Sequence, residues 1–98
     1  MNIEKTQSGS DLVISLDGRL DTTTAPELEA VLDSGLGGVS ELVFDFSELE
    51  YISSAGLRVI LKAQKTMNTQ GSMKLTHVND EIMEVFDITG FVDILVIE

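Results

Sequence analysis

One stretch of the chain limits its possible folds more than any other. The run from Glu41 to Phe46 is almost continuously apolar, and a short polar turn at Ser53-Ser54 follows it. From Ala55 to Asn68 the apolar residues recur at helical spacing. Such a run is typical of a strand that helices cover on both faces, and a strand followed by a helix predicts a parallel α/β sheet.

The predicted helix from Ala55 to Asn68 is amphipathic, and its outer side is basic. Its apolar face is formed by Leu57, Ile60, Leu61, Gln64 and Met67, widened by Val59 and Ala63, and its outer face by Arg58, Lys62, Lys65 and Thr69.

The N-terminal part predicts two strands and a first helix. Met1–Gln7 and Leu12–Leu16 read as an antiparallel hairpin that turns at Ser8–Asp11, and Asp17-Gly18 is expected to close it. The helix follows at Ala25-Pro26.

A capping box, formed by Thr24 and Glu27, is expected to start this first helix. Leu28, Val31 and Leu32 give its inward stripe, and Gly35 with Gly37-Gly38 ends it.

The C-terminal part predicts a strand at Met73–Val78, a helix capped by Asn79-Asp80 that stops at Thr89-Gly90, and a last strand at Ile94–Ile97. The alternation of strands and helices indicates right-handed parallel crossovers. The expected fold is therefore a single α/β domain over residues 1–98. Its small mixed sheet joins an N-terminal antiparallel hairpin to parallel strands, with three to four helices.

Composition excludes several classes of protein. Ninety-eight residues suffice for one hydrophobic core. The net charge of −11 argues against binding to DNA or RNA, whose phosphates repel an acidic protein. No apolar run reaches the roughly 20 residues that a membrane span needs. The chain has no cysteine, and its N-terminus lacks the features of a signal peptide. We expect a cytoplasmic protein, monomeric in isolation, with no membrane contact.

No motif for catalysis or metal binding is present. His77, the only histidine, alternates with apolar residues of a strand and is expected to be structural or on the surface. The carboxyl ends of parallel strands share one edge with the helix starts, so Asp45, Asp21 and Ser54 are expected there together. They are either caps and turn residues or an acidic rim around a serine, which would recruit a partner with basic groups or a metal-bearing nucleotide site.

The serine pair itself has two interpretations. Ser53 or Ser54 is an N-cap of the helix, or its hydroxyl is a site where another protein adds a phosphate. The turn Ser-Ser-Ala-Gly is small and leaves a hydroxyl unobstructed, and Arg58 in the first turn could meet the phosphate.

Two segments resemble the STAS-domain anti-sigma factor antagonists. They are LDGRLDTTTAPEL at Leu16–Leu28 and VFDFSELEYISSAGLRVIL at Val43–Leu61, and ITGF at Ile88–Phe91 is similar to the family's third-helix ending. The resemblance implies a regulatory protein, not an enzyme. Unphosphorylated, it binds an anti-sigma factor serine kinase and so frees the sigma factor.

In this family the kinase uses its own ATP to phosphorylate the antagonist, which breaks the complex, and a serine phosphatase reverses the step. The resemblance assigns the phosphate to Ser54, with Ser53 as the alternative because many relatives carry Asp at that place. The chain needs no cofactor of its own. The implied partner-binding residues are Asp21, Thr22, Thr23, Ser53, Ser54, Ala55, Gly56 and Arg58.

Other functions stay open at this point. A member that is not phosphorylated would be a STAS scaffold or a module accessory to a transport complex, and the same helix start would also permit a small ligand or a nucleotide. The chain ends at Glu98, directly after the last expected strand, where relatives often add another helix.

Overall fold

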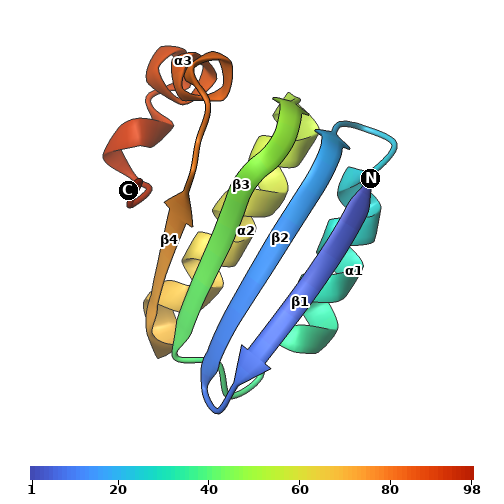
Figure 1. The fold of residues 1–98 in the computed structure, drawn as a ribbon. Helices are drawn as coiled ribbons and strands as arrows, with labels where there is room; N and C mark the ends of the chain where they lie inside the picture. Colours follow the sequence, from blue (N-terminus) through green and yellow to red (C-terminus); the bar gives the residue numbers. More distant parts are fainter.

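The computed structural model describes residues 1–98 as four strands, three α-helices and one short 3-10 helix (Figure 1). In chain order these are β1 (Asn2–Ser8), β2 (Asp11–Leu20), α1 (Ala25–Gly35), β3 (Glu41–Ile52), α2 (Ser54–Gln70), β4 (Ser72–Thr76), α3 (Asp80–Thr89) and the 3-10 helix η1 (Phe91–Asp93). None of the helices is both long and apolar enough to cross a membrane.

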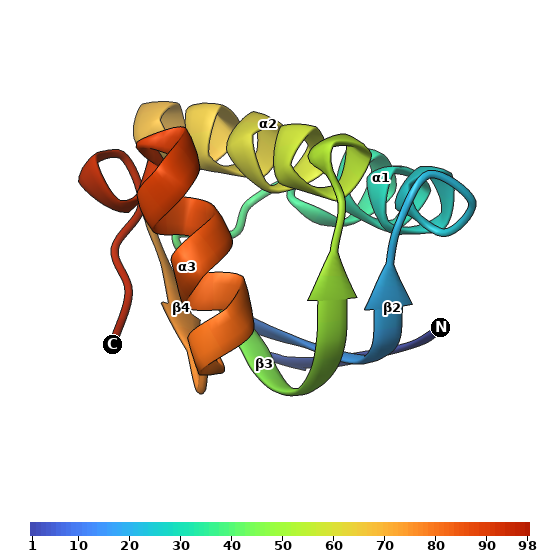
Figure 2. The ribbon, with the colours of Figure 1, turned by 90° about the horizontal axis from the view of Figure 1, so that it is seen from above.

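The four strands form one sheet in the order β1-β2-β3-β4 (Figure 1). β1 and β2 are antiparallel, whereas β2, β3 and β4 run parallel, so the predicted mixed sheet is confirmed. Each parallel connection steps to the next strand in the same direction. Because such connections have one preferred hand, α1 and α2 lie on the same face of the sheet, as Figure 2 shows.

The prediction of helices on both faces of β3 is wrong. Leu42, Phe44 and Phe46 are fully buried, but Val43 and Asp45 between them are only partly buried. This alternation arises because α1 and α2 cover one face, while α3 lies at the end of the sheet beside β4 (Figure 2). One face of the central strands is therefore left without a helix.

The hairpin turns where it was predicted to turn, but Asp17-Gly18 does not close it. Ser8 pairs with Asp11, and Gly9 between them has the positive φ of 63° that the turn requires. Asp17 and Gly18 lie inside β2, which continues to Leu20. The register with β3 shifts on both sides of this dipeptide, so it forms an irregularity within the strand.

The core lies between the sheet and the two crossover helices. Leu28 and Leu32 of α1 and Ile60 and Met67 of α2 are buried there, as their spacing predicted. Burial of these side chains supplies the main favourable free energy of folding. The polar side of α2 faces away from the sheet.

The C-terminal segment is only partly as predicted. The helix α3 is capped by Asn79, whose side chain accepts a hydrogen bond of 2.8 Å from the backbone of Ile82. The expected strand at Ile94–Ile97 is reduced to a single parallel bridge between Leu75 and Ile97. The reason is that the backbone N–H groups of Ile94 and Leu95 both donate to the carbonyl of Phe91, so the turn of η1 extends into the first half of the predicted strand.

Candidate functional site

The centre of the site is the turn between β3 and α2. Ser53 is the N-cap of α2, and its Oγ accepts a hydrogen bond of 3.3 Å from the backbone N–H of Gly56. The backbone N–H of Ser53 also donates to the carbonyl of Leu20 at 2.9 Å. The second bond ties the start of α2 to the end of β2.

Ser54 has a different environment from its neighbour. It is the first residue of α2, its side chain is exposed, and its hydroxyl makes no hydrogen bond within the chain. Since Ser53 already caps the helix, the Ser54 hydroxyl is free for other chemistry. The sequence left the roles of the two serines open, and the structure gives the cap to Ser53.

Gly56 allows this turn to approach β2 closely. A Cβ atom at this position would lie 2.7 Å from Cγ of Leu20, 3.0 Å from Cγ1 of Ile52 and 3.0 Å from the carbonyl oxygen of Leu20. Only a residue without a side chain fits there without a shift of backbone or core. The position of Ser54 therefore depends on Gly56.

The loop between β2 and α1 lies beside the serine turn and is organised by Asp21. Its Oδ1 accepts hydrogen bonds from the backbone N–H groups of Thr23 at 3.0 Å and Thr24 at 3.1 Å. The bond from Thr24 is the largest of the effects that hold the pKa of the Asp21 carboxyl below its usual value. Asp21 thus stiffens the loop that carries Thr22 and Thr23, both of which are exposed.

The predicted capping box of α1 is wrong. Thr24 is the N-cap residue, but its side chain makes no capping bond to the helix. Its Oγ1 instead accepts from the backbone N–H of Asp21 at 2.9 Å and donates to the carbonyl of Arg19 at 2.7 Å. The Thr24 hydroxyl closes the loop and does not cap the helix. The reciprocal pair of bonds between Thr24 and Glu27 that defines a capping box is therefore not formed.

Arg58 lies one turn along α2 from Ser54 and is exposed without an ion pair. Together with Thr22, Pro26 and Ala55, it lines a shallow hollow between the first turns of α1 and α2. Thr22, Ala55 and Arg58, three of the predicted partner-binding residues, are therefore brought to one surface, whereas Gly56 is buried.

At the start of α2 the backbone N–H groups of Ser54 and Ala55 have no partner in the chain, which favours negative charge there. At the start of α1, in contrast, Ala25 and Glu27 are hydrogen-bonded and Pro26 has no N–H.

Asp45 does not belong to this edge, contrary to the prediction. It lies seven residues before Ile52, the last residue of β3, because that strand is longer than its apolar run. Its Oδ1 accepts from the backbone N–H of Ser47 at 3.0 Å and lies 3.2 Å from Nδ1 of His77. The bond from Ser47 is the main cause of the lowered pKa of Asp45.

His77 is on the surface, as expected, and it pairs with Asp45 far from the serine turn. No group of three or more His, Cys, Asp or Glu side chains is arranged to hold a metal ion.

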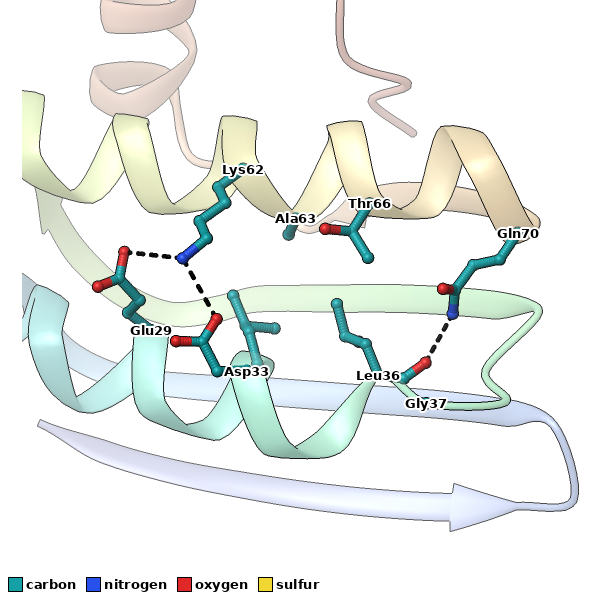
Figure 3. Close-up of a pocket in the computed structure, with 9 residues that line it drawn as sticks. Glu29, Asp33, Leu36, Gly37, Lys62, Ala63, Thr66 and Gln70 are labelled. Carbon is teal, nitrogen blue, oxygen red and sulfur yellow. Dashed lines mark hydrogen bonds and ion pairs between the residues drawn. The ribbon is translucent and has the colours of Figure 1, made fainter.

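A second hollow, drawn in Figure 3, lies between α1 and the later turns of α2. Lys62 bridges Glu29 at 3.5 Å and Asp33 at 3.2 Å, and the hydrogen bond to Asp33 is the main cause that raises the pKa of Lys62. Gln70 Nε2 donates to the carbonyl of Leu36 at 2.6 Å. These contacts hold the two helices together at a distance from Ser54.

Sequence reasoning missed two residues beside the serine turn. Cζ of Arg19 lies 4.3 Å from the centroid of the Tyr51 ring, and its Nε lies 4.0 Å from Oδ2 of Asp21. Arg19 and Tyr51 are partners in the parallel pairing of β2 with β3. Their contact joins residues 32 positions apart (51 minus 19), so only a predicted strand register could have indicated it.

Comparisons with known proteins agree with this architecture. BtrV of Bordetella bronchiseptica, named as a candidate anti-sigma factor antagonist, is 39% identical over 85 residues, which are 85% of this chain and 73% of BtrV. The anti-sigma-B factor antagonist of Bacillus subtilis is 30% identical over 96 residues, which are 97% of this chain and 88% of that protein.

Among solved structures, the anti-sigma factor antagonist SpoIIAA in its unphosphorylated form matches with a TM-score of 0.78 at 18% identity, over 99% of this chain and 87% of that chain. The phosphorylated form, described as a Bacillus cell fate determinant, matches with the same TM-score of 0.78 at 19% identity, over 99% and 91% of the two chains. The model of the STAS domain family matches residues 2–98. The chain therefore belongs to the STAS domain family, and curated relatives of it bear the name anti-sigma factor antagonist.

Proposed function

We propose that the chain is an anti-sigma factor antagonist switched by a phosphate on Ser54. Unphosphorylated, it binds an anti-sigma factor that is a serine kinase, and the sigma factor is released. The kinase transfers a phosphoryl group from its own ATP to Ser54, the complex dissociates, and a serine phosphatase restores the binding form. All of these steps belong to the cytoplasm.

The observation that carries this proposal is the contrast between the two serines. The Ser53 hydroxyl caps the helix, while the Ser54 hydroxyl at the helix start makes no hydrogen bond within the chain. A kinase needs an accessible hydroxyl. When the Ser54 oxygen bonds to the γ-phosphorus of ATP, it loses only its proton and ADP leaves, so no hydrogen bond of the fold is broken. The names of the curated relatives support the role of anti-sigma factor antagonist.

A phosphate at Ser54 would change the surface without unfolding the domain. It adds roughly −1.5 to −2 charges at the start of a helix, where the dipole and the free N–H groups tolerate them. Arg58, unpaired and four residues further on, is a cation near that charge. A partner surface that is complementary to the small, neutral serine turn no longer fits the turn once it carries the phosphate.

The test is phosphorylation by a serine kinase of the anti-sigma factor class. With ATP, intact-mass spectrometry should show one added phosphate on the wild type and on Ser53→Ala, and none on Ser54→Ala. Ser54→Asp should bind the kinase at least about tenfold more weakly, which is 1.4 kcal/mol.

Two results would contradict the assignment. If Ser54→Ala still takes up phosphate, the acceptor is another residue. If no variant is modified and the charged variant binds as well as the wild type, the chain acts as a STAS scaffold or transport accessory in which the serine turn is only structural.

A further inference from the structure

Tyr51 is the one aromatic side chain on the surface of the protein. Phe44, Phe46 and Phe86 are completely buried and Phe91 is partly buried, whereas Tyr51 is 41% exposed. Exposed aromatic side chains are enriched among the residues that dominate binding between proteins. Its position therefore bears on where a partner docks.

The Tyr51 ring is held in place by Arg19. The guanidinium carbon lies 4.3 Å from the ring centroid, which is the geometry of a cation–π contact. Asp21, 4.0 Å from Nε of Arg19, restrains the guanidinium from its other side. A side chain fixed before binding loses less conformational entropy when a partner covers it.

This pair adjoins the serine turn but lies on the other side of the sheet from the core. Leu20 and Ile52 are register partners and are buried, so Arg19 and Tyr51, one residue earlier in each strand, lie on the opposite face. The same Leu20 accepts the backbone hydrogen bond of Ser53. The serine turn, the Asp21 loop and Tyr51 thus form one continuous rim.

The open face of the sheet is acidic. On the face without α1 and α2, a shallow hollow is lined by four carboxylates, Glu4, Asp17, Asp45 and Glu48. Asp17 and Glu48, which are register partners, lie nearest the rim, whereas Asp45 lies further along β3 from the serine turn. Asp17 lies two residues before Arg19 in the same strand. With a net charge of −11 on the whole chain, this face attracts a positively charged surface.

We propose that Tyr51, positioned by Arg19, anchors the anti-sigma factor on this rim, and that the partner brings basic side chains to the adjoining carboxylates. The inference rests on the proposed function and extends its binding surface from the serine turn onto the open face of the sheet. Tyr51 contacts the partner directly, and Arg19 is a positioning residue.

The chain contains a single tyrosine, so 3-fluorotyrosine labels Tyr51 alone. The probe is the anti-sigma factor kinase that phosphorylates this chain, added to the labelled full chain. The one fluorine resonance should shift when the complex forms. Calorimetry should show that Tyr51→Ala binds at least about tenfold more weakly, while Tyr51→Phe stays within about threefold of the wild type.

Arg19 and the charges need their own measurements. Arg19→Ala should weaken binding about threefold or more, and Arg19→Lys should restore part of the loss because a cation again lies over the ring. Affinity should fall as salt is raised. Val96→Ala is the matched control, because Val96 is an exposed apolar residue (56%) next to the outer strand β4 and away from the rim.

The outcomes separate this inference from the function on which it rests. An unshifted resonance in a complex that calorimetry detects, or full affinity of Tyr51→Ala, would overturn the anchor and leave the function standing. Affinity that rises with salt would overturn the basic partner surface. If the wild type does not bind the anti-sigma factor, the proposed function fails and the inference fails with it.

Discussion

Replacement of Gly56 by alanine tests whether the serine turn depends on its close approach to β2. The new Cβ would lie 2.7 Å from Cγ of Leu20 and 3.0 Å from the Leu20 carbonyl oxygen. The leucine side chain can rotate away, but the carbonyl belongs to the strand and accepts the hydrogen bond of Ser53. To relieve the contact, the start of α2 must move away from β2.

Two opposing terms decide the size of the effect. In an ordinary helix interior, alanine is more stable than glycine by about 0.5–1 kcal/mol. Overpacking of a tightly packed site costs about 1–3 kcal/mol. The crowded contacts are to backbone and to buried Leu20 and Ile52, so the second term is the larger one. We expect a net loss of about 1–2 kcal/mol in the free energy of unfolding, or roughly 5–15 °C in Tm.

The measurement is urea denaturation at equilibrium, followed by circular dichroism. Gly37→Ala is the control, because Gly37 is exposed and a Cβ there meets nothing within 4 Å. That variant should match the wild type or exceed it slightly. Gly56→Ala should also bind the anti-sigma factor more weakly, since Ser54 is displaced. A Gly56→Ala protein as stable as the wild type would refute the argument from close approach.

Three further predictions concern stability. Ser53→Ala should lose about 1 kcal/mol, seen as a Tm about 4–8 °C lower, because the cap of α2 is removed, while Ser54→Ala should keep the wild-type Tm; equal losses would contradict the assigned roles. Asp21 has a lowered folded pKa, so its charge stabilises the fold above the unfolded value of 3.8, and this contribution disappears as the pH falls through the folded pKa. Asp21→Asn should therefore be less stable at pH 7 and equal to the wild type in strong acid; a difference independent of pH would argue against the charge. Gln64 is 6% exposed, and its Oε1 has no hydrogen-bond partner, so Gln64→Leu should raise the free energy of unfolding by about 1 kcal/mol. The measurement is chemical denaturation, and a lower free energy of unfolding for the variant would show that the amide is needed.

Much of the fold follows from local patterns that the sequence displays. The helical spacing of Leu57, Ile60 and Met67 and the cap at Asn79 correctly placed α2 and α3, because periodicity and capping involve residues within a few positions. The hairpin turn at Gly9 was predictable for the same reason. The charge and the serine-containing turn also predict a partner-binding surface, which stays a prediction.

The errors have a common origin. The apolar run ends at Phe46, but β3 continues to Ile52 because β2 lies alongside it as far as Leu20. That extension removes Asp45 from the edge that carries Ser54. The last strand is short because η1 precedes it.

The features that the sequence predicts depend on contacts between residues near in the chain, and those that only the structure shows depend on contacts between distant ones. Residue patterns determined which segments are helices or strands and that a serine pair stands at a helix start. Only the packed sheet decided that Ser53 caps and Ser54 is free, and that Arg19 meets Tyr51. The reason is physical: strand ends and cross-strand contacts are set by the pairing partner, which lies far away in the chain and enters no local pattern.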